Sequence, residues 1–410
     1  MKVFRTFDTQ LQRNLLILFA AGLFFWSSLS SLLPTLPLYL QDVGASKQQI
    51  GIVMGSFAIG MLLFRPWLGQ LADKRSRKLV LLIGILVEAI APIGYELVTS
   101  IPLLMVLRAF HGISIAAFAT GYMALIADLA PPKHRGEIIG YMSLVNPIGL
   151  AIGPALGGYI QAMVDYTAVF VLAAALGGLG ALCVVPIVNP SVQTQQAAEI
   201  QDTNFWRILI SPRVRIPALV MLVVGLAVGT LHTFAPLFIK STQVELNAGL
   251  FYTVAAVSSF SSRVFIGRAS DRFGRGLFVT IGLILYCLSM ALMWLANNST
   301  TFLVAALIEG AGGGTLIPMI STMMADRSFP QERGRVFAVC IAGFDLGIAI
   351  AGPILGSFAE QVGYRHMFGI TAGLTALGIL IFITKSSKDL GTSVRFAFGR
   401  TQDAYALNKI

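Results

Sequence analysis

The sequence predicts an all-α integral membrane protein with twelve transmembrane helices in two pseudo-symmetric six-helix bundles. Of its 410 residues, 56% are hydrophobic and only 12% are charged, whereas soluble domains are about 25% charged. A chain of this composition has too little polar surface to cover a soluble particle of its size. The lipid bilayer is therefore its predicted solvent. A series of apolar segments and an internal repeat predict the rest of the architecture.

Twelve apolar segments recur along the chain with short polar breaks between them. A membrane-spanning helix needs about 20 such residues. Helices are favoured because an open sheet would leave unpaired backbone groups in hydrocarbon. The predicted helices lie near 14–40, 49–71, 78–98, 102–128, 136–161 and 166–188, and near 215–239, 247–269, 276–296, 301–325, 335–360 and 364–385.

The two groups of six helices repeat one another. Identical residues recur at an offset of 198, for example Asp73 with Asp271 and Asp128 with Asp326. Transporters built from parallel repeats of this kind bind substrate near the bilayer midplane, between the halves. The predicted parts are a bundle over 1–188, a cytoplasmic linker over 189–214, a bundle over 215–385 and a cytoplasmic tail over 386–410. The tail is polar and is expected to be disordered.

Basic residues are distributed unevenly between the two sets of loops. Most of the 29 Lys and Arg residues lie in the N-terminal segment, the tail and the loops after even-numbered helices, whereas the opposite loops contain only Lys47, Lys240 and Arg365. Loops rich in Lys and Arg stay in the cytoplasm. Both termini are therefore predicted to be cytoplasmic, in a multi-pass protein of the plasma (cell inner) membrane. The first apolar segment is too long for a cleavable signal peptide.

Several other classes of protein are disfavoured. The net charge of +10 lies in membrane-flanking loops, so no nucleic acid partner is predicted. The three cysteines form no CxxC pair, and the four histidines share no metal-ligand spacing. No HExxH, GxxxxGK(S/T) or nucleophile-elbow motif occurs. We predict that the chain is not an enzyme, that it carries no metal or cofactor, and that it is a monomer.

The loops after the second and eighth predicted helices carry related motifs. The first reads GQLADKRSRK from Gly69, and the second reads GRASDRFGR from Gly267. Both resemble the loop signature of the major facilitator superfamily, GxxxD(R/K)xGR(R/K), and the resemblance extends over nearly the whole chain. The first copy departs from the signature at Ser76, where glycine is usual.

The resemblance implies a latch that holds the cytoplasmic side closed. In the family, the aspartate of the motif contacts the ends of neighbouring helices. Independently of the family, Gly69 permits close helix contact, and Asp73 among several bases should be ionised and paired. The alternative is that these charges only orient the loops. The implied latch residues are Gly69, Asp73, Arg77 and Asp128, with Gly267, Asp271, Arg275 and Asp326 as their repeat counterparts.

An arginine lies within the fourth predicted helix. Arg108 and Gly112 resemble the RxxxG signature of the family on this helix, although His111 replaces the usual glutamine. An arginine inside a membrane span is costly, so it should face a cavity or an acidic partner. Such a pair suits a proton-coupled carrier. The alternative is an arginine near the helix end that snorkels towards the headgroups.

The fifth predicted helix contains glycines four residues apart, followed by proline. This spacing permits close helix packing, and the proline removes a backbone hydrogen bond and bends the helix. The sequence resembles GxxxGPxxGG, a signature of antiporter branches of the superfamily, and the eleventh helix has a reduced copy. The resemblance implies an exporter of the drug/proton antiporter type. The predicted hinge residues are Gly149, Gly153, Pro154, Gly157, Gly158, Gly352 and Pro353.

Three acidic residues inside predicted spans are candidates for carrying protons. An ionised carboxylate is costly to bury, so such a group can gain and lose a proton as access alternates. Asp345 is the first candidate because its repeat position holds the neutral Asn146. Glu309 and Glu88 follow, with Arg108 as a basic partner. The alternatives are static ion pairs, or contact of Glu88 with the headgroups.

Aromatic and polar residues of both halves are candidates for lining a substrate cavity, and together they suit amphipathic molecules. The first helix lacks the acid that some multidrug antiporters of this family carry there, which disfavours a dedicated exporter of organic cations. We predict a secondary active transporter that exports drugs or small amphipathic metabolites in exchange for protons. The alternative is an importer or facilitator of a sugar, organic acid or other small nutrient. The cavity candidates are Trp26, Tyr122, Asn146, His232 and Phe344.

Overall fold

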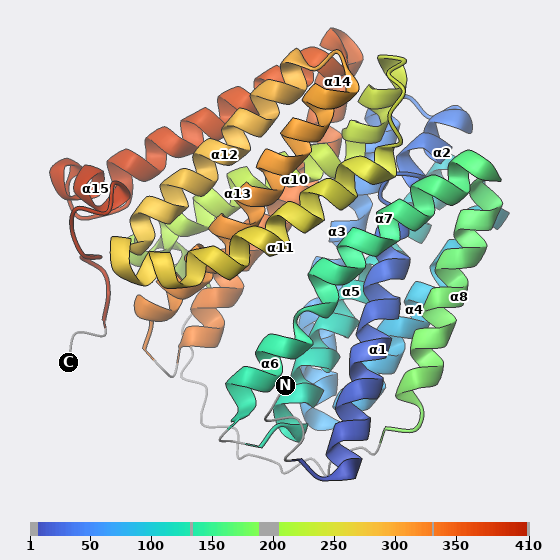
Figure 1. Ribbon diagram of the computed structural model, residues 1–410, viewed down its shortest axis with the longest axis horizontal. Coiled ribbons are helices and arrows are strands. Elements are labelled where there is room, and N and C mark those ends of the chain that lie inside the picture. Colours follow the sequence, from blue (N-terminus) through green and yellow to red (C-terminus); the bar gives the residue numbers. More distant parts are fainter. Residues whose placement is uncertain (1–6, 132–133, 188–204, 330–331, 408–410) are drawn as a thin grey trace. The chain divides into compact units, whose positions relative to one another are not determined.

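The computed structural model describes residues 7–131, 134–187, 205–329 and 332–407, and every regular element within them is helical (Figure 1). Eleven stretches of these residues are long and apolar enough to cross a membrane. The last stretch, Arg335–Lys385, contains two helices that meet at Gly363, where φ is +78°. The prediction of an all-α membrane protein with twelve spans is therefore confirmed.

The chain divides into two compact units. Unit 1 comprises Met1–Ala45, Ile52–Ala197 and Asn247–Thr253, and unit 2 comprises Ser46–Gly51, Ala198–Leu246 and Val254–Ile410. The helices mostly or wholly in unit 1 are α1 (Thr9–Ser31), α2 (Leu36–Asp42), α3 (Lys47–Lys74), α4 (Arg77–Leu97), α5 (Ile101–Leu129), α6 (Arg135–Met142), α7 (Val145–Met163) and α8 (Tyr166–Val184). Those mostly or wholly in unit 2 are α9 (Phe205–Ile210), α10 (Pro212–Ser241), α11 (Ala248–Phe273), α12 (Arg275–Leu295), α13 (Ser299–Asp326), α14 (Arg333–Lys385) and α15 (Leu390–Ala397). Of the predicted linker, residues 189–204 lie outside the described residues.

Two predicted helices are each interrupted once. The predicted helix over 14–40 is divided into α1 and α2, because Pro34 cannot continue the hydrogen-bond ladder of α1. The predicted helix over 136–161 is divided into α6 and α7 near Ser143. Pro147, four residues further on, has no N–H to donate to the Ser143 carbonyl.

The same packing pattern occurs in both units. In unit 1, α1 packs against α7 and α8, and α4 packs against α5 and α8. In unit 2, α10 packs against α14, and α12 packs against α13 and α14. Because α14 is two helices joined at Gly363, its first and second parts correspond to α7 and α8. The glycine takes the repeat position of Asp165, which caps the start of α8 in unit 1.

Glycines set the distance between α1 and α7. A Cβ atom added at Gly149 would meet Trp26 and Ser27, and one added at Gly157 would meet the backbone of Ser31. Ser30 of α1 lies at this contact, because its Oγ is 2.6 Å from the Trp26 carbonyl oxygen of α1 and 2.9 Å from the Gly149 carbonyl oxygen of α7. The predicted glycine-rich motif is therefore a site where two backbones approach closely.

We expect Gly157→Ala to destabilise the protein, because the added methyl has no space beside α1. Forcing extra atoms into a packed contact costs about 1–3 kcal/mol. The matched control is Gly140→Ala on α6, where nothing lies within 4 Å of an added Cβ. That change should be neutral or stabilising, by up to about 1 kcal/mol, because alanine favours the helix. Thermal unfolding in detergent compares the two, and equal melting temperatures would contradict the packing role.

The C-terminal segment is ordered, so the expectation of a disordered tail was wrong. Residues 390–397 form α15, and Asp389 caps its start by accepting a hydrogen bond from the Thr392 amide at 2.9 Å. The other end is attached to α12, because Thr280 Oγ1 donates to the Ala397 carbonyl at 2.8 Å. The expectation was based on the overall polarity of the tail and did not consider Phe396, which is buried with Ala397.

Candidate functional site

Unit 1 contains a buried network of polar side chains centred on Glu88 of α4. Glu88, His111 and Ser114 are 0% exposed. The Glu88 carboxylate accepts hydrogen bonds from His111 Nε2 and from Ser114 Oγ of α5, each at 2.9 Å. Ser28 Oγ of α1 lies 3.0 Å from the other carboxylate oxygen, Glu88 Oε1. An acidic group without access to water is thus held by three donors, which offsets much of its desolvation.

Arg108 completes the network through His111. Its guanidinium lies 3.1 Å from His111 Nδ1, and the Tyr95 hydroxyl lies 3.0 Å from the same nitrogen. Arginine can only donate, so Nδ1 accepts and the imidazole proton resides on Nε2, where it is donated to Glu88. The imidazole therefore links a cation to an acid, much as a carboxylate orients a histidine in other proton-transfer sites.

The position of Ser28 allows Glu88 to hold a proton without any side-chain movement. Ser28 Oγ is 3.0 Å from Glu88 Oε1 and 2.7 Å from the Ala173 carbonyl. Its single hydrogen can be donated to only one of them. When Glu88 is ionised, Ser28 donates to Glu88. When Glu88 is protonated, the acid donates to Ser28, and Ser28 donates to Ala173. The geometry thus accommodates both protonation states.

The structure excludes two alternatives left open by the sequence. Arg108 is only 6% exposed and contacts His111, so it does not snorkel. Glu88 is enclosed within its bundle and does not face the headgroups. Arg108 is expected to face a cavity or an acidic partner; it contacts His111, which lies between it and Glu88. Ser28, Ser114 and Tyr95 were not predicted, although Tyr95 lies two helical turns after Glu88 on the same face of α4.

One donor of the network has no hydrogen-bond partner among the described residues. Arg108 Nε is buried and makes no hydrogen bond within the described residues. The guanidinium is instead covered by the Phe57 ring of α3, with its carbon 4.4 Å from the ring centroid. A buried donor of this kind is a place where water or a ligand can bind.

Unit 2 places a second acid at the equivalent level of its repeat. Glu309 of α13 lies next to the Tyr286 side chain of α12 and interacts with it. At the offset of 198, Glu309 takes the position of His111 and Tyr286 takes that of Glu88. Each unit thus has an acid and its partner at the same two repeat positions. The acid is on α4 in unit 1, whereas in unit 2 it is on α13, the counterpart of α5. Asp345, the first-ranked proton candidate, is also buried, at 5% exposed on α14.

The two latch motifs form the same ion pair in each unit. Arg77 pairs with Asp128 and donates to the Ala124 carbonyl at 3.1 Å. Arg275 pairs with Asp326 and donates to the Thr322 carbonyl at 2.7 Å. Each position of the first set has its counterpart 198 residues later, with the Thr322 carbonyl in place of the Ala124 carbonyl. Each arginine therefore joins the end of one helix to the end of another within its own unit.

The first residues of the motifs contribute less to these contacts. Asp73 is exposed at the end of α3 and makes no ion pair within the described part of the chain. Nothing lies within 4 Å of a Cβ atom added at Gly69. The side chain of Asp271 and the surroundings of Gly267 lie outside what the structure describes.

The remaining hinge residues lie in close backbone contacts. Gly153 faces Ser27 and Ser30 of α1, and Pro154 follows it within α7. The Gly158 carbonyl accepts a hydrogen bond from Asn247 Nδ2 at 2.8 Å within unit 1. Gly352 packs against Gly51 within unit 2, and Pro353 lies inside α14.

The predicted cavity residues belong to different units. Tyr122 is buried, and its ring stacks on that of Phe118 with centroids 4.8 Å apart. Trp26 meets Phe118 edge-on at 6.3 Å, and Asn146 is half-buried on α7. These residues belong to unit 1. His232 of α10 and Phe344 of α14 are half-buried in unit 2.

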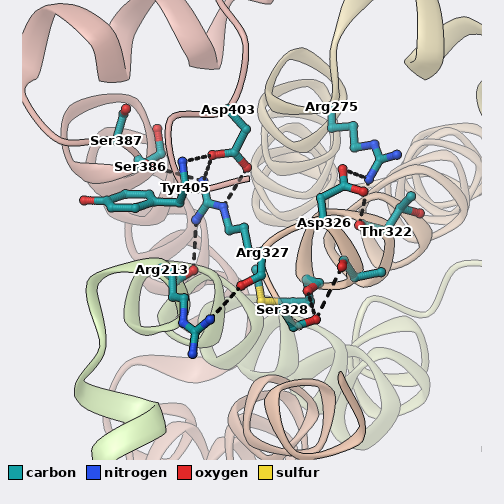
Figure 2. Close-up of polar contacts among 12 residues, drawn as sticks. Arg213, Arg275, Thr322, Asp326, Arg327, Ser328, Ser386, Ser387, Asp403 and Tyr405 are labelled. Atoms are coloured by element: carbon teal, nitrogen blue, oxygen red, sulfur yellow. Dashed lines mark hydrogen bonds and ion pairs between the residues drawn. The ribbon is translucent and has the colours of Figure 1, made fainter. Parts of the chain in front are cut away.

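A second cluster of charges surrounds the loop between α13 and α14 (Figure 2). Arg327 is 0% exposed, and its Nε and Nη2 atoms bind the Asp403 carboxylate at 2.7 and 3.0 Å. The guanidinium also donates to the carbonyls of Arg213 and Ser386, at 3.0 and 3.1 Å. Next to it, the Leu407 amide donates to the Asp326 carbonyl at 2.8 Å. The tail is therefore bound to the loop that contains the second latch aspartate.

Arg213 closes this cluster on the side of α10. Its guanidinium binds Glu332 at 2.6 and 2.9 Å. Burial acts to raise the pKa of Glu332, but hydrogen bonds from Arg213 and the Phe329 amide outweigh it and hold that pKa below its ordinary value. Sequence reasoning missed Arg213, Arg327 and Asp403, because they are far apart in the sequence and belong to no repeated motif.

Comparisons with known proteins identify the family to which this chain belongs. The sequence profile of the Major Facilitator Superfamily matches residues 17–268 and 243–397. The chain therefore belongs to this family of membrane transporters, as its motifs predicted.

Relatives in this family align along most of the chain. The multi-drug resistance efflux pump PmrA homolog of Lactococcus lactis is 26% identical over 377 residues, covering 88% of this chain and 92% of the relative. The staphylopine export protein of Staphylococcus aureus is 26% identical, covering 89% and 94%. The quinolone resistance protein NorA of the same species is 23% identical, covering 91% and 96%.

Solved structures share the fold. The nucleoside transporter NupG superposes with a TM-score of 0.79 at 17% identity, covering 92% of this chain and 100% of that one. A bacterial homolog of the human lysosomal transporter Spinster superposes with a TM-score of 0.72 at 14% identity, covering 96% and 97%. The predicted superfamily fold is confirmed by both likenesses.

Proposed function

We propose that this transporter exports drugs or small amphipathic metabolites in exchange for protons, and that Glu88 carries the coupled proton. The observation that carries the proposal is the Ser28 geometry, which accommodates Glu88 both with and without a proton. The relatives named as efflux and export proteins support the direction of transport. We further propose a monomer in the plasma membrane with both termini in the cytoplasm, as the distribution of Lys and Arg favours.

The burial of the network supports a mechanism of alternating access. Glu88 and His111 have no exposed surface, so a proton can reach them only in another conformation. Ionised Glu88 balances the charge of Arg108, whereas protonated Glu88 leaves the bundle with an unbalanced cation. Protonation thus changes the relative free energies of states that differ in access to water, and this is the requirement for coupling. Each proton that moves inward through 100 mV supplies about 2.3 kcal/mol for export.

The direct test is proton flux in proteoliposomes that contain a pH-sensitive dye. A panel of amphipathic cations, neutral drugs and organic acids is added, and internal pH is followed for wild type, Glu88→Gln, Glu309→Gln and Asp345→Asn. Proton movement that depends on a substrate and is lost in Glu88→Gln supports the proposal. If proton movement is lost only in Asp345→Asn, Asp345 on α14 carries the coupled proton instead of Glu88. Solute movement with no proton signal in any variant would overturn antiport.

We also expect Asp73→Asn to lower transport about tenfold while leaving the amount of folded protein unchanged. Among the described residues Asp73 makes no ion pair, so its replacement breaks no ion pair that the structure describes in this state. A decrease would report a second conformation in which the aspartate is paired, and coupling of this kind is typically worth a factor of about 5–150. Asp73→Glu keeps the charge and is the matched control. Wild-type turnover in Asp73→Asn would refute the latch role.

A further inference from the structure

α15 has an exposed apolar face in addition to the face that packs on unit 2. Its inner face consists of Ser393, Phe396 and Ala397, which are buried. Leu390, Val394 and Phe398 follow one another at four-residue spacing and are 62%, 36% and 48% exposed. Residues at this spacing lie above one another on a helix. They form a continuous apolar stripe beside the inner face, which we call the outer stripe.

Basic side chains border the outer stripe. Lys385, Lys388, Arg395 and Arg400 are all exposed, and none forms an ion pair with an acid among the described residues. The nearby acids are already engaged. Hydrogen bonds from Thr392, with a smaller contribution from Arg395, hold the pKa of Asp389 below its ordinary value, and this side chain caps the helix. Asp403 is bound by Arg327. The segment therefore presents an uncompensated positive charge next to apolar groups.

α15 lies just beyond the last stretch that is long and apolar enough to cross a membrane. The last membrane-spanning stretch ends at Lys385, and α15 begins at Leu390. In unit 2, α15 lies at the end of α14 and packs against α14 and α12 (Figure 1). A helix five residues beyond a span remains close to the headgroups, where Lys and Arg meet phosphate while Leu and Phe reach the acyl boundary.

The helix is also fixed in orientation before any lipid binds. Asp403, beyond its C-terminal end, is bound to buried Arg327, and the Ala397 carbonyl is bound to Thr280. The peptide at Phe396 packs against Gly276 of α12, where a side chain would not fit. A surface held in this way loses little conformational entropy on binding.

We propose that α15 is a membrane-surface helix that binds anionic phospholipid, with the outer stripe in the acyl boundary and the basic residues on the headgroups. Anionic lipid attracts basic segments next to a membrane span, and the four basic residues here surround a preformed apolar stripe. This surface is separate from the buried acids of the transport proposal.

The experiment measures the depth of a nitroxide label in nanodiscs. Val394→Cys carries the label on the outer stripe, and Gln402→Cys carries it on the exposed segment after α15. Both are made in the full chain with Cys183, Cys287 and Cys340 replaced by serine or alanine. Nanodiscs contain phosphatidylcholine alone or mixed with phosphatidylglycerol. At position 394 we expect access to oxygen but not to a polar nickel chelate in the mixed discs, and at position 402 the reverse.

The triple variant Lys388→Gln, Arg395→Gln and Arg400→Gln tests headgroup recognition. We expect this variant to need about tenfold more anionic lipid for the same label depth, because each basic residue adds attraction to the surface. Access of the nickel chelate to position 394 in both lipid mixtures would overturn the proposal. Equal depth in both mixtures would overturn recognition of the headgroups. A third outcome concerns the protein in detergent, without lipid. If position 394 becomes less accessible to the nickel chelate as protein concentration rises, a second copy of the chain covers the outer stripe. This result would also overturn the proposal.

Discussion

Glu88→Gln is expected to abolish proton coupling. Glutamine has the size of glutamate, its amide oxygen can accept from His111 and Ser114, and its amide nitrogen can donate to Ser28. It cannot gain or lose a proton. Removing a positioned proton carrier typically costs a factor of 10²–10⁴, so we expect proton-driven export to fall at least about a hundredfold. Exchange of labelled for unlabelled substrate without a pH gradient should continue, because it needs no net proton movement.

The control for this prediction is Glu96→Gln, near the C-terminal end of α4. Glu96 is exposed and bonds to Thr167 at the end of the neighbouring α8, at 2.9 Å. Its replacement should leave both assays unchanged. If Glu88→Gln abolishes exchange as well as export, the network is needed for folding or for movement of the bundle. If it changes neither, the coupled proton is carried elsewhere.

The repeat explains how much of this arrangement was visible in the sequence. Apolar segments of spanning length and identical residues at a fixed offset predicted the helices. The family resemblance of the paired motifs named Arg77 with Asp128, and Arg275 with Asp326, as members of a latch, and the structure shows that each of these two pairs is in contact. Such features are local or periodic, so they can be recognised in the sequence without a structure. Arg108 and Glu88 were identified because charged residues are rare in apolar segments.

The residues that the sequence did not reveal act through contacts between distant segments. Ser28 is an ordinary small residue until α1 places it between Glu88 and the Ala173 carbonyl. Phe396 and Asp403 belong to a polar tail whose composition is typical of disorder, and only their contacts with α12 and Arg327 order it. One buried arginine thus fixes a segment whose average composition predicts none of its structure.

Arg327→Ala is expected to release this segment. The substitution leaves the Asp403 carboxylate without its partner and removes the donor from two carbonyl groups, those of Arg213 and Ser386. Breaking a buried ion pair by removing one member costs about 3–5 kcal/mol. The Asp403 side chain is 13% exposed, so water recovers part of this and the lower end of the range is expected. Much faster hydrogen exchange over 386–407 should accompany a lower melting temperature.

Arg215→Ala is the matched control, because this arginine lies on the same helix as Arg213 and is exposed. It should change neither exchange nor melting. The double variant Arg327→Met with Asp403→Asn removes both charges at once, so it should be less destabilised than the sum of the single changes if the pair is coupled. Additive effects would mean that the two side chains act independently. In that case the tail would be held chiefly by Phe396 and the contact of Thr280 with Ala397, and Thr280→Val would then be the change that frees it.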